Sequence, residues 1–240
     1  MRSIKLSYVS LAALLALAST TAAQAQQAGD TIVSIGAARI SPKVSLGALN
    51  SVGPAPFADA FNVSTAGATA SAGYADTLSF SVLQMFTNNV AVEFSLGVPP
   101  TLNLDVLLPN VSSVALSRAA TADVLTPTAV VKYLFNSPAD KWRPYVGLGL
   151  TYASFDKVTA DKSNATVNAL AGTSASLSSS WAPVYSAGII YNITERLSIN
   201  ALVAYIPLKT DVSFVGSGTT TTGSMELNPT DYVVRLGYKF

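Results

Sequence analysis

The sequence predicts an all-β fold, an eight-stranded antiparallel transmembrane β-barrel with short periplasmic turns and long extracellular loops. Half of the 240 residues are hydrophobic and only 11% are charged, whereas about 25% are charged in a typical soluble domain. Eight segments alternate apolar and polar residues with the period of a β-strand. The connections between these segments are short and long in turn, which is the layout of an outer-membrane barrel.

The first 25 residues are predicted to be a signal peptide. Arg2 and Lys5 precede the apolar run VSLAALLALA (9–18), and AQA (23–25) supplies the small residues for cleavage after Ala25. This run is shorter than the roughly 18 to 20 apolar residues of a membrane helix, which argues against the alternative of an anchor. Residues 26–240 then form the barrel, and they contain 12 basic and 13 acidic residues once Arg2 and Lys5 are removed.

The eight alternating segments are the predicted strands. They begin at or near residues 31, 77, 90, 122, 143, 181, 196 and 231. In VAVEFSLGV (90–98), large apolar residues alternate with Ala91, Glu93, Ser95 and Gly97. A transmembrane strand needs about 9 to 11 residues. Because lipid offers no hydrogen bonds to the backbone, such strands must close into a barrel with the apolar face outward.

The lengths of the connections indicate which end of the barrel faces the periplasm and which end faces the outside. Short ones, rich in Asn, Asp and Pro, lie at 87–89, 136–141 and 192–195. Long ones, rich in small and polar residues, lie at about 41–73, 99–120, 156–179 and 211–223. Outer-membrane barrels keep short turns on the periplasmic side and long loops outside. A soluble β-sandwich, the alternative fold, would keep both ends short and expose more charge.

Composition weighs against an enzyme. The sequence contains no cysteine and no histidine, so it lacks a thiol nucleophile, thiolate metal ligands and the commonest general base. It also contains no phosphate loop and no carboxylates paired at a constrained spacing. The net charge near zero gives no reason to expect a nucleic-acid partner. We therefore expect no catalytic residues, no metal and no cofactor.

Several motifs resemble the outer membrane protein W family. They are GDTIVSIGAARISP (29–42), LTPT (125–128), SSW (179–181), RPYVGLGLTYASF (143–155) and NPTDYVVRLGYKF (228–240). The resemblance implies an eight-stranded barrel that helps small hydrophobic molecules through the outer membrane. The family often has two prolines where this chain has Thr126 and Pro127, and an acidic residue where it has Ser179. The terminal Phe240 resembles the signal by which barrel-assembly machinery recognises its clients.

Four polar residues with inward parity are expected at one level of the lumen. Glu93 follows the first short turn by four residues, Lys132 precedes the second by four, Asn200 follows the third by five, and Arg235 lies five residues before the terminus. Isolated charges in a narrow apolar interior cost several kcal/mol each, so we expect these groups to pair and close the lower lumen. The alternative is that Lys132 and Arg235 extend separately to water.

Above this layer the inward positions become apolar or small, which predicts a funnel for apolar molecules. Its wall is predicted to include Phe155, Val184, Leu202, Ala204 and Ile206. A lateral exit is predicted where prolines interrupt neighbouring strands, at Pro99, Pro100 and Pro127, because proline cannot donate to a ladder. The alternative is that Pro99 and Pro100 only begin a loop.

Aromatic residues on the outer face are expected to form girdles. Trp142, Tyr145, Tyr152, Trp181 and Tyr205 are assigned to them. Trp181 is also a candidate residue of the funnel mouth, although its parity, counted from Tyr191, points to lipid.

Three functions follow from these features. The first is passive passage of small hydrophobic molecules, which enter an apolar upper lumen and leave laterally into the bilayer. The second is a non-conducting structural or adhesive barrel whose loops bind host, phage or bacteriocin ligands. The third, an outer-membrane lipase, is disfavoured by the missing histidine. Expected partners are outer-membrane lipid, small hydrophobic solutes and the barrel-assembly machinery, with no nucleic acid and a monomeric barrel.

Overall fold

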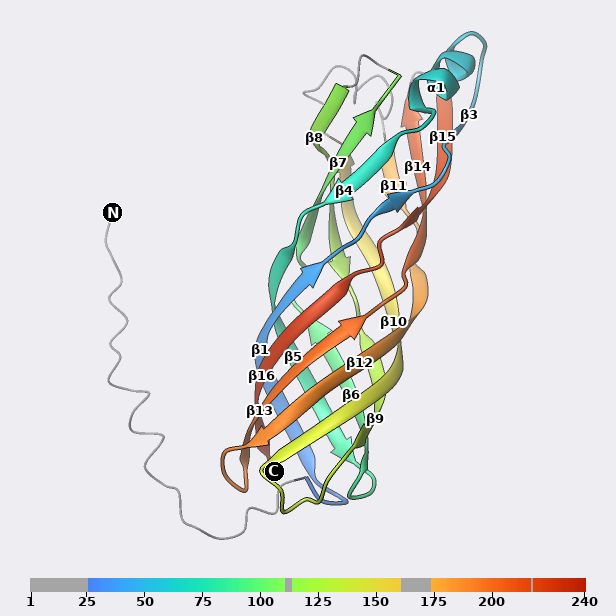
Figure 1. Ribbon diagram of the computed structural model, residues 1–240. Helices are drawn as coiled ribbons and strands as arrows, with labels where there is room; N and C mark the ends of the chain where they lie inside the picture. The colour runs from blue at the N-terminus through green and yellow to red at the C-terminus, as the bar shows by residue number, and fades with distance from the viewer. Residues whose placement is uncertain (1–25, 111–113, 161–173, 217) are drawn as a thin grey trace, which may run out of the picture.

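Eight strands form a closed antiparallel barrel (Figure 1). The computed structural model describes residues 26–110, 114–160, 174–216 and 218–240, so the predicted signal peptide lies outside the described residues. The barrel strands are β1 (Thr31–Ser41), β5 (Ala75–Met85), β6 (Val90–Gly97), β9 (Thr128–Leu134), β10 (Trp142–Ala160), β12 (Ser180–Asn192), β13 (Leu197–Tyr205) and β16 (Thr230–Lys239). Each pairs with the next in chain order, and β16 pairs with β1 to close the sheet. The predicted eight-stranded barrel is confirmed.

Strand β16 shows how the alternation of apolar and polar residues in the sequence corresponds to the two faces of the barrel. Tyr232, Val234 and Leu236 are about half exposed on the outer face, whereas Val233 and Arg235 are buried in the interior. The same alternation continues around the barrel, so a broad apolar band covers the outside. A closed ladder satisfies the backbone without water, which lets this band contact lipid.

Paired aromatic rings mark the two edges of the apolar band. Near the short turns, the ring centroids of Trp142 and Tyr191 are 4.3 Å apart and those of Tyr238 and Phe240 are 5.1 Å apart. Towards the other end, Tyr152 contacts Trp181 at 5.0 Å. These positions match the aromatic girdles of outer-membrane barrels.

Outward-facing charges lie beyond the upper girdle. Arg39 and Asp76 form an ion pair of 2.7 Å, and Lys157 and Asp123 one of 3.0 Å. The hydrogen bond from Arg39 lowers the pKa of Asp76, and the one from Thr101 lowers the pKa of Asp123. Ionised side chains on the outer face place this level above the hydrocarbon.

The long connections are not irregular loops, as the sequence suggested, but contain further strands. They are β2 (Ser45–Leu46), β3 (Asn50–Val52), β4 (Thr69–Ala72), β7 (Thr101–Leu108), β8 (Val114–Leu125), β11 (Ser174–Leu177), β14 (Lys209–Gly216) and β15 (Thr219–Glu226). They continue the wall beyond the membrane as two sheets, with the helix α1 (Phe57–Thr65) at the tip (Figure 1). Figure 1 shows the short turns and the C-terminus at the opposite end. Within the described residues, no helix is long and apolar enough to cross a membrane.

The fourth predicted strand is divided into two. β8 and β9 are separated by Thr126 and Pro127, and each pairs with a different part of the wall. Proline fixes φ and lacks the N–H of a ladder residue, which accounts for the break.

Buried apolar residues fill the lumen above and below a polar layer. The lower cluster lies towards the short turns and contains Ile32, Leu83, Met85, Ala91, Leu134, Tyr145 and Ile190. The upper cluster includes Val130, Ala153, Ala182, Val184, Ala204, Ile206, Leu208, Val212, Met225 and Leu227. The charged residues of the candidate site lie between these clusters.

Candidate functional site

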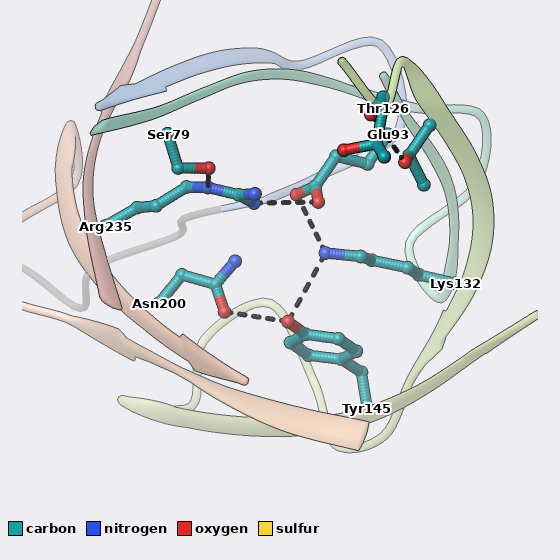
Figure 2. A network of polar contacts seen from close by, with 8 residues as sticks. Ser79, Glu93, Thr126, Lys132, Tyr145, Asn200 and Arg235 are labelled. Atoms are coloured by element: carbon teal, nitrogen blue, oxygen red, sulfur yellow. Dashed lines mark hydrogen bonds and ion pairs between the residues drawn. The ribbon is translucent and has the colours of Figure 1, made fainter. Parts of the chain in front are cut away.

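Glu93 joins two cations in the lumen. One carboxylate oxygen, Oε2, lies 2.7 Å from Lys132 Nζ, and the other, Oε1, lies 3.0 Å from Arg235 Nη1. Figure 2 shows Glu93 between the two cations, which project from opposite walls of the barrel. All three side chains are at most 5% exposed. The structure therefore brings these predicted residues together as ion pairs, rather than extending the cations separately to water.

Neutral groups complete the layer (Figure 2). Arg235 Nε donates to Ser79 Oγ at 2.9 Å, and Lys132 Nζ donates to the Tyr145 hydroxyl at 3.3 Å. The Tyr145 hydroxyl in turn donates to Asn200 Oδ1 at 2.8 Å. Asn200 thus belongs to the same network but contacts the charges through Tyr145. We call Ser79, Glu93, Lys132, Tyr145, Asn200 and Arg235 the charged layer.

Tyr145 corrects the sequence interpretation, which assigned it to the outer girdle. It is 2% exposed and lies in the lumen, where Lys132 Nζ is 4.3 Å from its ring centroid. Gly188 provides the space, because a Cβ there would come within 2.6 Å of the Tyr145 hydroxyl oxygen. The signal was present in the sequence: Tyr145 shares the parity of Gly147 and Gly149, and the large apolar residues Val146, Leu148 and Leu150 take the alternate positions on the outer face.

The base of the barrel contains a further buried cation that the sequence analysis did not single out. Arg143 is fully buried, and its Nη1 donates to the Gln26 carbonyl at 2.8 Å, while Nη2 donates to the Asn88 carbonyl. Gln26 is itself buried, and its amide donates to Asn192 Oδ1 at 2.7 Å. These contacts fill the short-turn end below the charged layer. An eight-stranded barrel is narrow enough for side chains to fill its interior.

The predicted wall residues lie above the charged layer. Val184, Ala204 and Ile206 are buried in the upper apolar cluster, and Phe155 and Leu202 pack against it while partly buried. Leu202 also packs against the lower cluster. Two cavities lie within this region. The lower, the lumen cavity, has a volume of about 490 Å³ including its open part, and is lined by Ile40, Pro42, Pro100, Leu102, Val124, Thr126, Thr151, Ile206, Leu208, Leu227, Pro229 and Asp231.

The upper cavity lies between the two extracellular sheets. It has a volume of about 880 Å³ including its open part. Its lining is mainly aliphatic and includes Leu104, Leu108, Leu177, Val212, Phe214 and Met225. Leu102 lines the lower cavity and Leu104 the upper one, two residues further along β7, so the apolar lining continues from one to the other.

The predicted prolines border an interruption in the wall. The ladder between β6 and β9 ends at the pair Ser95–Thr128, and pairing resumes between β7 and β8 at Thr101–Asp123. Below that pair, Val124 donates to the Pro100 carbonyl at 3.1 Å. Among these described residues, no backbone hydrogen bond joins 96–99 to 125–127. We call this interruption the seam.

Side-chain hydroxyls satisfy carbonyl groups beside the seam. Thr128 Oγ1 lies 3.0 Å from the Thr126 carbonyl, and Thr151 Oγ1 donates to the Pro127 carbonyl at 3.1 Å. The Tyr152 amide also donates to the Pro127 carbonyl at 3.1 Å. In lipid an unbonded backbone group costs several kcal/mol, so these contacts allow the wall to be interrupted there.

Two other predicted residues lie on the outer face. Trp181 is 68% exposed and packs on Tyr152, so it does not line the funnel mouth. The reason is the uninterrupted register between β10 and β12, which keeps its outward parity. Phe240 is 77% exposed, its ring packs on Tyr238, and its amide donates to the Thr31 carbonyl at 3.0 Å.

The apolar outer band, the closed ladder, and the long hairpins at one end together define an integral outer-membrane β-barrel protein. The sequence profile of the OmpW family matches residues 27–240, so the chain belongs to the OmpW family.

The comparisons with individual proteins agree with this membership. The chain is 28% identical to outer membrane protein W of Vibrio cholerae over 165 residues, which are 68% of this chain and 73% of that protein. It is 27% identical to outer membrane protein AlkL of Ectopseudomonas oleovorans over 213 residues, 88% and 82% of the two chains. The crystal structure of OprG from Pseudomonas aeruginosa has the same fold, with a TM-score of 0.76 at 24% identity, covering 90% of this chain and 98% of that one. The protein is located in the outer membrane, with its short turns on the periplasmic side.

Proposed function

We propose that the barrel gives small hydrophobic molecules passive passage across the outer membrane. They enter the apolar upper lumen from outside and leave sideways into the bilayer through the seam. The observation that carries this proposal is the position of the lumen cavity, whose lining includes Pro100 and Thr126 beside the seam. The charged layer lies below this cavity and opposes a route straight through the barrel.

The electrostatics support a lateral route. An apolar solute that continued downward would have to separate Glu93 from Lys132 and Arg235, and breaking a buried pair costs about 3 to 5 kcal/mol. Below that layer, Arg143 and Gln26 fill the periplasmic end. A sideways route requires no such separation, because the seam lacks backbone rungs.

The height of the seam also supports release into lipid. Asp123, whose ion pair with Lys157 marks the upper limit of the apolar band, lies three residues beyond Thr126 on the extracellular side. The outward residues next to the seam, including Leu96 and Tyr152, are apolar or aromatic. A hydrophobic solute leaving there would meet lipid rather than water.

Passive passage, which needs no catalytic group, fits a chain that contains neither histidine nor cysteine. It also requires no second subunit, because one chain closes its own barrel. Outer-membrane lipid is then the receiving phase for the solute.

The test compares two substitutions in reconstituted vesicles. Leu202→Asp places a charge in the apolar wall and should strongly reduce uptake of a radiolabelled alkane, while ion leakage stays low. Glu93→Gln should raise leakage of small ions, while alkane uptake falls much less because the route leaves the lumen above that residue. Leu202→Met is the control and should retain uptake. Folding is checked by the shift in gel mobility on heating.

Two results would contradict the proposal. If folded Glu93→Gln protein loses alkane uptake while Leu202→Asp keeps it, the solute passes straight through and the lateral route is wrong. If vesicles containing the native protein take up alkane no faster than empty vesicles, the barrel does not conduct such solutes. A structural or adhesive role of the extracellular sheets would then be the better interpretation.

A further inference from the structure

Asp231 places a carboxylate in the apolar part of the lumen. It lies on β16, four residues from Arg235 towards the extracellular side, which is about 13 Å along a strand. Its Oδ1 atom is buried, and no described residue donates a hydrogen bond to that atom. Buried polar atoms in native proteins nearly always have a partner. A donor from outside the described residues, either water or a bound solute, is therefore the expected partner of Asp231 Oδ1.

The surroundings of Asp231 determine what such a donor would be attached to. The lumen cavity that Asp231 lines is otherwise mainly apolar, with Ile206, Leu208 and Leu227 in its lining. Thr151 also lines it, but its hydroxyl already donates to the Pro127 carbonyl. The cavity thus combines an aliphatic wall with a carboxyl acceptor, which suits a molecule with an apolar body and one polar end.

The neighbouring charges favour a neutral donor. The charged layer below contains the cations Lys132 and Arg235 and the anion Glu93, so it carries an excess of one positive charge. Arg143 at the base is a further buried cation, so the buried charged residues described comprise three cations and one anion. A hydroxyl group would bond the Asp231 carboxyl without adding charge, whereas an ammonium group would add one more cation to this interior.

We propose that Asp231 selects apolar solutes that carry one neutral hydrogen-bond donor, of which a medium-chain aliphatic alcohol is the simplest example. The hydroxyl donates to Asp231 Oδ1 while the alkyl chain packs against the aliphatic lining. This inference rests on the proposed passage of hydrophobic molecules and specifies which of them the lumen cavity prefers.

Binding is tested by NMR on the folded protein in lipid nanodiscs, with methyl-labelled Ile206 and Leu208 as reporters. The probes are 1-octanol, octane and n-octylamine, which is protonated at neutral pH. The native protein should bind 1-octanol more tightly than octane. Asp231→Leu should lose about tenfold in affinity for 1-octanol and keep its affinity for octane, since one hydrogen bond in a buried site is removed. Asp231→Asn, which keeps an oxygen acceptor, should be intermediate.

Asp211→Asn is the matched control, because it removes an exposed carboxylate from β14 outside the lumen cavity. It should bind all three probes like the native protein. Equal native affinities for 1-octanol and octane, or unchanged 1-octanol affinity in Asp231→Leu, would overturn the role of Asp231. Tighter binding of n-octylamine than of 1-octanol would overturn the preference for a neutral donor.

Uptake into vesicles separates this inference from the proposed function. Binding of 1-octanol that depends on Asp231, without uptake of any probe, would support the selective site and overturn the passage of solutes. Uptake of 1-octanol and octane at equal rates, in both native and Asp231→Leu protein, would support passage and overturn the selectivity.

Discussion

Glu93 joins the two cations of the charged layer, and each cation also contacts a neutral member of the layer. Lys132 comes from β9, the strand next to Glu93, whereas Arg235 comes from β16 on the opposite wall (Figure 2). One carboxylate therefore ties two walls of the barrel together. Removing it would leave two buried cations without an anion, which is more costly than replacing the whole cluster by apolar groups.

The first prediction at the residue scale concerns stability. Glu93→Gln should lower the free energy of unfolding by about 3 to 5 kcal/mol, because the amide cannot neutralise Lys132 and Arg235. Urea unfolding in lipid vesicles, followed by tryptophan fluorescence, measures this change. Asp76→Asn is the control: its ion pair with Arg39 is more than half exposed, so the unfolding midpoint should stay where it is. Equal midpoints for Glu93→Gln and the native protein would show that the layer does not stabilise the barrel.

At the scale of elements, prolines at similar heights interrupt two neighbouring strands. Pro99 and Pro100 lie between β6 and β7, and Pro127 lies between β8 and β9. The fixed φ of proline differs from the value in an antiparallel strand, and its nitrogen donates no hydrogen bond. Backbone hydrogen bonds between 96–99 and 125–127 are thus missing among the described residues where the lumen cavity approaches the wall.

Pro127→Val should strengthen the wall at this place. Valine can adopt the φ of a strand and restores an N–H that can bond to β10, which would straighten the chain beside the seam. One added ladder bond contributes about 1 kcal/mol, which corresponds to about a fivefold smaller open population. Alkane uptake should slow by that factor, while thermal stability is kept or raised. Pro138→Ala, in a short periplasmic turn, is the control; if Pro127→Val conducts as fast as that control, the seam is not the exit.

The strands show how far the sequence could predict these elements. A strand side chain points to one of two faces, so alternation alone gave the inward parity of Glu93, Lys132 and Arg235. Which atoms meet across the lumen depends on strand tilt and stagger, which no local pattern contains. Tyr145 was assigned outward because aromatic residues are common in girdles, although its parity indicated the lumen.

The long connections were the other part that the sequence did not predict. The strands β14 and β15 are rich in Ser, Thr and Gly, and their alternation is too weak to distinguish from a polar loop. They pair with each other as a hairpin, and their outer edges pair with β2, β3 and β11 from distant parts of the chain. Strand propensity depends strongly on such neighbours. Asp231 was not predicted either, since only the structure reveals that its Oδ1 atom has no donor among the described residues.

At the scale of the whole molecule, the barrel is layered along its axis. The base holds Arg143 and Gln26, the charged layer comes next, and the apolar cavities lie above and extend between the extracellular sheets. The barrel around these layers is closed by its first and last strands, β1 and β16, which pair over ten residues. The last backbone contact of that closure is the Phe240 amide bonded to the Thr31 carbonyl.

Deletion of Phe240 should therefore slow assembly more than it destabilises the finished barrel. The ring is largely exposed and the deletion removes one hydrogen bond of a long ladder, so the folded protein should persist. If the terminal aromatic is the signal read by the barrel-assembly machinery, the heat-modifiable band should appear several-fold more slowly in vesicles that contain the machinery. In vesicles without it the rate should change little. Phe240→Trp, which keeps a terminal aromatic, should assemble like the native chain; a truncated protein that folds as fast as the native one in both kinds of vesicle would rule out a role for Phe240 in assembly.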